Sequence, residues 1–102
     1  MSKKIKVSEL PVFDVADYLD SEEKIAEYLA LVMEDDDPAL LIAALGDVAR
    51  ARGMTQLARE TGLSRESLYR SLSVDGNPSF ATVSKAMRAL GLKLVPRPAA
   101  AR

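Results

Sequence analysis

The chain has 102 residues, of which 48% are apolar, and its formal net charge is −1. This length fits one small domain with its own core. The absence of cysteine excludes disulfides, thiolate catalysis and zinc–thiolate sites, and the absence of histidine removes the commonest general base. Because no stretch could span a bilayer and no apolar segment follows the charged N-terminus, we expect a soluble cytoplasmic protein without a membrane partner.

The N-terminal third predicts one helix preceded by less regular chain. We expect residues 1–12 to form a short strand or a flexible arm, and residues 14–19 to form one helical turn capped by Asp14. A longer helix follows, with Asp20 as its N-cap and Glu23 completing a capping-box pattern. Its apolar stripe has helical spacing. The stripe consists of Ile25, Tyr28, Leu29 and Val32.

The next helix has clear signals at both ends. Asp37 is a good N-cap, Pro38 suits the first helical position, and Gly53 predicts the end of the helix. The segment between them is apolar most of the way round. We therefore expect this helix at the centre of the core or shared with a partner.

Two short helices then form the most informative pattern in the chain. Thr55 is the expected cap of the first, which ends at Gly62, and Ser64 caps the second, which ends at Leu72. Ala58 supplies a small residue where the helices cross. Apolar side chains can pin the second helix to the core: Leu57, Leu63, Leu68 and Leu72. This is the layout of a helix-turn-helix.

The C-terminal part predicts a last helix and an irregular end. Turn residues at 75–78 lead to a helix capped by Ser79 and ended by Gly91. The expected fold is all-α with about five helices, and Leu92–Val95 and Ile5–Val7 are candidates for short terminal strands. We expect an arm and helix at residues 1–36, a helix-turn-helix domain at 37–95, and a flexible tail at 96–102.

The charge is divided between the two halves of the chain. Residues 1–49 carry four lysines and twelve acidic residues, a net of −8, whereas residues 50–102 carry ten basic and three acidic residues, a net of +7. A basic half attracts polyanions, and an acidic half attracts basic partners. The alternative is that both charge runs are simply solvated surface.

A helix-turn-helix places its second helix in the major groove of DNA. Arg65 and Arg70 can contact guanine edges or phosphates, and Glu66 can accept from cytosine or orient Arg70. Gln56 can reach a phosphate or an adenine. The expected DNA contacts are Thr55, Gln56, Ser64, Arg65, Glu66, Ser67, Tyr69, Arg70 and Asn77. The alternative for each arginine is a solvated surface charge.

The segment GMTQLARETGLSRESLYRSLSVDGNPSFATVSKAMRALGLKL, residues 53–94, resembles the addiction-module antidote proteins. These are HigA-like antitoxins with an Xre/Cro-type helix-turn-helix, and the resemblance extends upstream to Phe13. It implies a lambda-repressor-like DNA-binding domain and a homodimer on operator DNA at its own promoter. It also implies a small basic toxin partner of the RelE/HigB type, an mRNA-cleaving nuclease. Gln56 and Ser71 depart from the wider Xre pattern.

The acidic half suits contact with such a basic toxin. We expect four residues to contribute, because buried aromatic anchors carry much of the energy of an interface. They are Phe13, Tyr18, Leu19 and Tyr28. The alternative for Tyr28 and Leu29 is a place in the core. The terminal strands could pair with each other, across a dimer, or with a toxin sheet edge.

Three other interpretations compete with that of an antitoxin that represses its own operon. One is a stand-alone Xre-type repressor without a toxin, and another is a helical interaction domain that does not bind DNA. The third is an enzyme with a magnesium site at residues 34–37. Consecutive acidic residues diverge too much to coordinate magnesium unaided, so we expect no enzyme, no metal and no cofactor.

Overall fold

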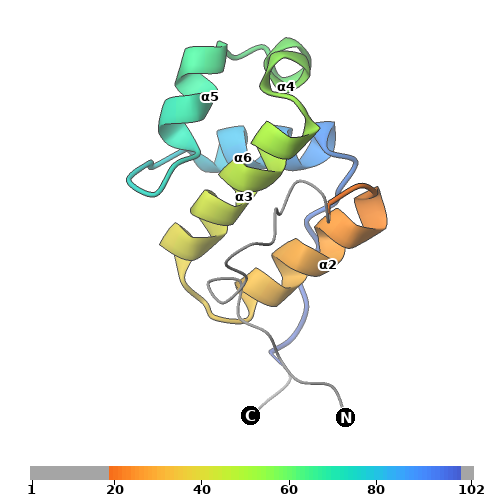
Figure 1. Ribbon diagram of the computed structural model, residues 1–102. Helices are drawn as coiled ribbons and strands as arrows, with labels where there is room; N and C mark the ends of the chain where they lie inside the picture. The colour runs from red at the N-terminus through yellow and green to blue at the C-terminus, as the bar shows by residue number, and fades with distance from the viewer. Residues whose placement is uncertain (1–18, 100–102) are drawn as a thin grey trace, which may run out of the picture.

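The computed structural model describes residues 19–99, which form five α-helices and no strand (Figure 1). The helices are α2 (Glu22–Met33), α3 (Pro38–Arg52), α4 (Met54–Thr61), α5 (Arg65–Ser71) and α6 (Phe80–Ala89). The expected all-α fold with five helices is confirmed. Leu92–Val95 forms no strand with any segment between residues 19 and 99, and its pairing across a dimer or with a toxin stays a prediction. The features expected before residue 19 lie outside the described residues.

Helix α2 begins one residue later than the sequence suggested. Its N-cap is Ser21, whose Oγ accepts a hydrogen bond from the Lys24 backbone N–H at 3.2 Å. Asp20 instead forms an exposed ion pair with the Lys24 side chain, at 3.4 Å between Oδ1 and Nζ. The predicted apolar stripe of α2 is confirmed, since all four of its residues are buried.

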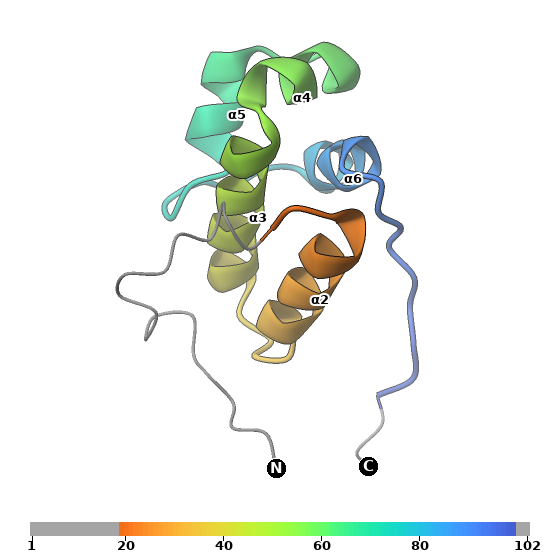
Figure 2. The same ribbon diagram turned by 45° about the vertical axis from the view of Figure 1, so that its right-hand side comes forward.

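Helix α3 lies at the centre of the fold, between α2 and the α4–α5 pair (Figures 1 and 2). Its predicted ends are confirmed: the Asp37 carboxylate accepts from the Ala39 N–H at 3.1 Å, and the helix ends at Gly53. The side chains buried along it are Ala44, Leu45, Val48 and Ala49. The expectation of a central core helix therefore holds.

One glycine inside α3 permits a close approach between two backbones. A Cβ atom at Gly46 would collide with the carbonyl oxygen of Leu72, the residue that ends α5. A glycine within a helix destabilises it by about 1 kcal/mol relative to alanine, so it is expected where packing requires it. This contact fixes the end of α5 directly against α3.

The core takes side chains from every helix. Its largest fully buried side chains are Leu19, Ile25, Leu45, Val48, Leu68 and Leu72. Between residues 19 and 99, no helix has the length and apolar character needed to cross a membrane.

Candidate nucleic-acid interface

Helix α4 follows α3 with a single residue between them. Gly53, at φ 113°, is both the C-cap of α3 and the N-cap of α4, and no side chain caps α4. The expected cap at Thr55 is therefore wrong. Thr55 lies exposed in the first turn of α4, because the positive φ of Gly53 lets the chain start the new helix two residues earlier.

The turn between α4 and α5 has the predicted geometry. Gly62 is left-handed at φ 78°, and its N–H donates to the Ala58 carbonyl at 3.0 Å. The Ser64 hydroxyl then accepts from the Ser67 N–H at 3.0 Å and caps α5. A three-residue turn thus joins two short helices, as in a helix-turn-helix.

The buried face of α5 anchors it to the core. Leu68 and Leu72 are 0% exposed, Leu57 of α4 is 3% exposed, and Leu63 in the turn packs against the same core. These are the four apolar residues that the sequence predicted for this role. With one face fixed, the opposite face of α5 is presented to solvent in a defined orientation.

The open face of α5 carries two arginines and an aromatic ring. Arg65, Tyr69 and Arg70 are exposed, and the Arg65 guanidinium lies over the Tyr69 ring. Within residues 19–99, no carboxylate lies within ion-pair distance of either arginine. Glu66 therefore does not orient Arg70 by an ion pair, which was one of its two expected roles. Both arginines remain available for an external anion.

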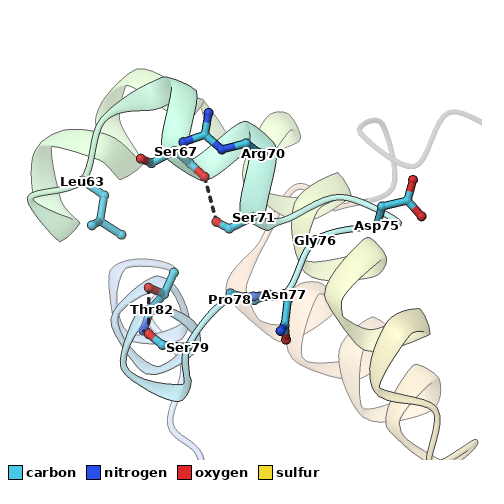
Figure 3. A pocket seen from close by; sticks show the side chains of 10 residues that line it. All are labelled: Leu63, Ser67, Arg70, Ser71, Asp75, Gly76, Asn77, Pro78, Ser79 and Thr82. Carbon is cyan, nitrogen blue, oxygen red and sulfur yellow. Dashed lines mark hydrogen bonds between the residues drawn. The ribbon is translucent and has the colours of Figure 1, made fainter.

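An open groove of about 400 Å³ separates α5 from the start of α6 (Figure 3). Its lining is rich in hydroxyls and joins α5 to the 75–79 loop. The lining residues are Leu63, Ser67, Arg70, Ser71, Asp75, Gly76, Asn77, Pro78, Ser79 and Thr82. Ser67 and Arg70 on α5 and Asn77 on the loop across the groove, three of the expected DNA contacts, thus line the same groove (Figure 3).

Hydrogen bonds order several hydroxyls of this groove. The Ser71 Oγ donates to the Ser67 carbonyl at 2.8 Å, and the Ser79 Oγ accepts from the Thr82 N–H at 3.1 Å. The sequence predicts Ser79 only as a cap and predicts no role for Thr82. The only signal for a wider role was the position of Ser79 directly after the turn residues that contain Asn77.

The two α4 candidates lie apart from this groove. Gln56 donates from Nε2 to the Glu60 Oε2 at 3.1 Å, and Thr55 is exposed one residue before it. Neither Thr55 nor Gln56 lines the groove. A phosphate contact by Gln56 would compete with its bond to Glu60.

Comparison with known proteins settles the family. Residues 9–98 match the sequence profile of a family described as probable addiction module antidote protein. The chain belongs to this family. It is also 54% identical over 85 residues to an uncharacterized protein of Haemophilus influenzae (strain ATCC 51907 / DSM 11121 / KW20 / Rd), an alignment that covers 83% of this chain and 88% of that protein. No solved structure matches.

The uneven charge of the antidote corresponds to a division in space. Residues 19–49 carry nine acidic residues and one lysine, a net of −8, and residues 50–99 carry nine basic and three acidic residues, a net of +6. Helices α4 and α5 lie at the end of the fold opposite the α2–α3 turn (Figures 1 and 2). A nucleic acid at α5 would therefore avoid the most acidic part of the molecule.

Two of the expected toxin contacts of the antidote are core residues. Leu19 is 2% exposed and Tyr28 is 7% exposed, so neither side chain can serve as a surface anchor in this conformation. The alternative for Tyr28, a place in the core, is what the structure shows. Burial first, and the charge of Asp47 second, raise the Tyr28 pKa above its ordinary value. Phe13 and Tyr18 lie outside the described residues.

No metal site is evident in the part of the antidote that the structure describes. Among residues 19–99, no three acidic side chains converge closely enough to hold an ion, and this includes the run at 34–37.

Proposed function

We propose that this antidote binds operator DNA as a homodimer, represses its own operon, and neutralises a RelE/HigB-type mRNA-cleaving toxin by direct contact. The observation that carries the DNA half of this proposal is the open face of α5. Arg65 and Arg70 are exposed there without an acidic partner, on a helix whose other face is fixed by Leu68 and Leu72.

The shape of this face suits the major groove of DNA. The groove is about 12 Å wide and admits an α-helix, and a guanidinium matches the two acceptors of guanine. The hydroxyl-lined groove between α5 and α6 can receive the adjacent backbone phosphates, with the exposed Asn77 and the Thr82 hydroxyl as hydrogen-bond donors, since the Ser79 hydroxyl already donates to the Thr82 Oγ1 at 3.1 Å. In this arrangement α5 reads bases, and the 75–79 loop sets the register.

A homodimer fits this mode of binding. Two α5 helices related by a two-fold axis would read half-sites about 34 Å apart, so the operator is expected to be an inverted repeat. The family membership supports a toxin partner, because an antidote of an addiction module acts against a toxin. The acidic first half supports a basic toxin.

Operator binding can be tested by fluorescence anisotropy with DNA from the chain's own promoter at 50–200 mM salt. Affinity should fall steeply with salt, because phosphate contacts release counterions. Arg70→Ala should reduce the salt slope by about 1 if Arg70 binds a phosphate, and should leave the slope unchanged if it reads a base. Lys93→Ala, an exposed change outside α5, is the matched control.

A flat salt response, or equal affinity for the promoter and for unrelated DNA, would contradict the DNA half of the proposal. The toxin half is tested by co-expression with the adjacent reading frame. If the product of that frame does not co-purify with the antidote, a stand-alone repressor becomes the better explanation.

A further inference from the structure

Two exposed leucines lie at the α2–α3 end of the fold, away from the DNA-reading face. Leu31 on α2 is 39% exposed and Leu40 on α3 is 43% exposed. Neither is needed for the core, and neither is near α4 or α5, which lie at the opposite end of the molecule (Figure 1). Their exposure therefore has no explanation in the DNA-binding function.

The two leucines lie on either side of the α2–α3 turn. Leu31 lies in the last turn of α2 and Leu40 in the first turn of α3, and only residues 34–37 separate these helices along the chain. Helices α2 and α3 pack against each other, so the turn holds both side chains at the same end of the pair.

We call the apolar side chains at this end of the helix pair the outer seam: Leu31, Leu40 and the half-buried Ala43, which lies one helical turn after Leu40 on α3. None of the three belongs to the buried core cluster.

An acidic rim surrounds the outer seam. Glu27 lies one helical turn before Leu31, and the turn that follows α2 carries Asp35, Asp36 and Asp37. The one basic residue of the 19–49 segment, Lys24, is ion-paired with Asp20. Residues 19–49 carry a net charge of −8, so an apolar seam within this segment complements a basic protein and repels DNA.

We infer that the outer seam is the docking surface for the basic toxin, with Leu31 and Leu40 as apolar contacts and the rim as the source of electrostatic attraction. This inference rests on the proposed toxin partnership and specifies where the toxin binds. It replaces Leu19 and Tyr28, which are buried, with exposed residues of the same segment. Because the apolar strip is small, charge must contribute much of the association rate.

The test uses the full-length chain and the protein encoded by the adjacent reading frame, with affinities measured by biolayer interferometry. Leu31→Arg and Leu40→Arg each place a cation in the seam, and each should weaken toxin binding at least about tenfold. Val74→Arg is the matched control, since it adds the same charge at a 69% exposed apolar residue near α5. It should leave toxin affinity within about twofold of the unchanged chain.

A second variant tests the rim without touching the seam. The double substitution Glu27→Lys and Asp35→Lys should slow toxin association about tenfold or more at low salt and much less at high salt. Both side chains are exposed, so the fold should be retained, and the circular-dichroism spectrum checks this. Operator affinity should not fall in any of the seam or rim variants.

The outcomes separate this inference from the function on which it rests. If the unchanged chain does not bind the neighbouring protein, the toxin partnership itself is wrong. If that protein binds and both arginine variants bind it equally well, the seam is not the docking surface. Loss of the homodimer in Leu40→Arg with toxin affinity retained would also overturn the inference, because the seam would then bind a second copy of the chain.

Discussion

The guanidinium carbon of Arg65 lies 5.7 Å from the centre of the Tyr69 ring, one helical turn farther along α5. This is within the range of a cation–π contact, worth about 0.5–1 kcal/mol at an exposed site. The contact holds the arginine against the helix surface. If Arg65 reads a base, Tyr69 positions it before DNA arrives.

This relationship predicts different effects for two substitutions at one position. Tyr69→Phe keeps the ring and should change operator affinity little, whereas Tyr69→Leu should weaken binding by about 0.5–1 kcal/mol. Arg65→Ala should cost about 1–3 kcal/mol if the arginine contacts a base. Anisotropy titrations with the promoter fragment measure all three. Equal losses for Phe and Leu would show that the hydroxyl, rather than the ring, matters.

The cap of α2 predicts a contrast between neighbouring residues. Ser21→Ala removes the acceptor for the Lys24 N–H and should lower the free energy of unfolding by about 1 kcal/mol. Asp20→Ala removes only an exposed ion pair and should change it by less than about 0.5 kcal/mol. Urea unfolding followed by circular dichroism distinguishes them. If Asp20→Ala lowered the free energy of unfolding more than Ser21→Ala, Asp20 rather than Ser21 would be the cap.

The contact between Gly46 and Leu72 predicts that alanine, the best helix-forming residue, destabilises the fold at position 46. On propensity alone, Gly46→Ala should stabilise α3 by about 1 kcal/mol. The new Cβ instead meets a backbone carbonyl, and overpacking of this kind costs about 1–3 kcal/mol. We expect a lower melting temperature and weaker operator binding. An increase in melting temperature would show that α5 moves aside without cost.

The raised pKa of Tyr28 predicts a loss of stability at high pH. The folded chain retains the phenol proton above the ordinary value of 10.0, because burial and then Asp47 disfavour the phenolate. The unfolded chain therefore binds fewer protons in this range, and the free energy of unfolding falls as pH rises above about 10. Below that pH, this contribution is fully present.

Tyr28→Phe serves as the comparison, because it keeps the ring in the core and removes the titrating group. The difference in unfolding free energy between the two chains should be constant up to about pH 9 and should shift in favour of the variant above pH 10. Urea unfolding at pH 8 and pH 10.5 is sufficient. If the difference in unfolding free energy between the two chains were the same at both pH values, the assigned environment of Tyr28 would be contradicted.

The features predicted correctly from sequence are those fixed by neighbouring residues. Asp37, Ser64 and Ser79 each cap a helix through a bond to a backbone N–H two or three residues away. Gly62 supplies a left-handed residue in the expected turn. Such contacts depend on local spacing alone, so the outline of the helix-turn-helix could be predicted.

The sequence predictions failed where two neighbouring residues suit the same role, or where the packing of distant segments decides whether a residue is buried. Asp20 and Ser21 are both good caps, and Gly53 could end one helix and begin the next without help from Thr55. The burial of Leu19 and Tyr28 depends on how α2 packs against the rest of the fold. No spacing rule in a single sequence supplies that packing.

The groove between α5 and α6 was only partly predictable for the same reason. Asn77 was expected to contact DNA, but its place on the lining of the same groove as Ser67 and Arg70 depends on the path of the loop between α5 and α6. Thr82 gave no signal, because a threonine in the first turn of a helix is ordinary. The outer seam was also missed, since Leu31 and Leu40 come together only through the α2–α3 pairing.

The contact at Gly46 helps to fix the position of α5 through residues other than its exposed side chains. The end of the helix is held by backbone atoms of Leu72 and its inner face by leucines, whereas Arg65, Glu66 and Arg70 are exposed. If α5 reads an operator as proposed, substitutions at Arg65, Glu66 or Arg70 would change the sequence that it reads and leave the helix in place. Related antidotes would then differ in target sequence through a few surface changes on one common scaffold.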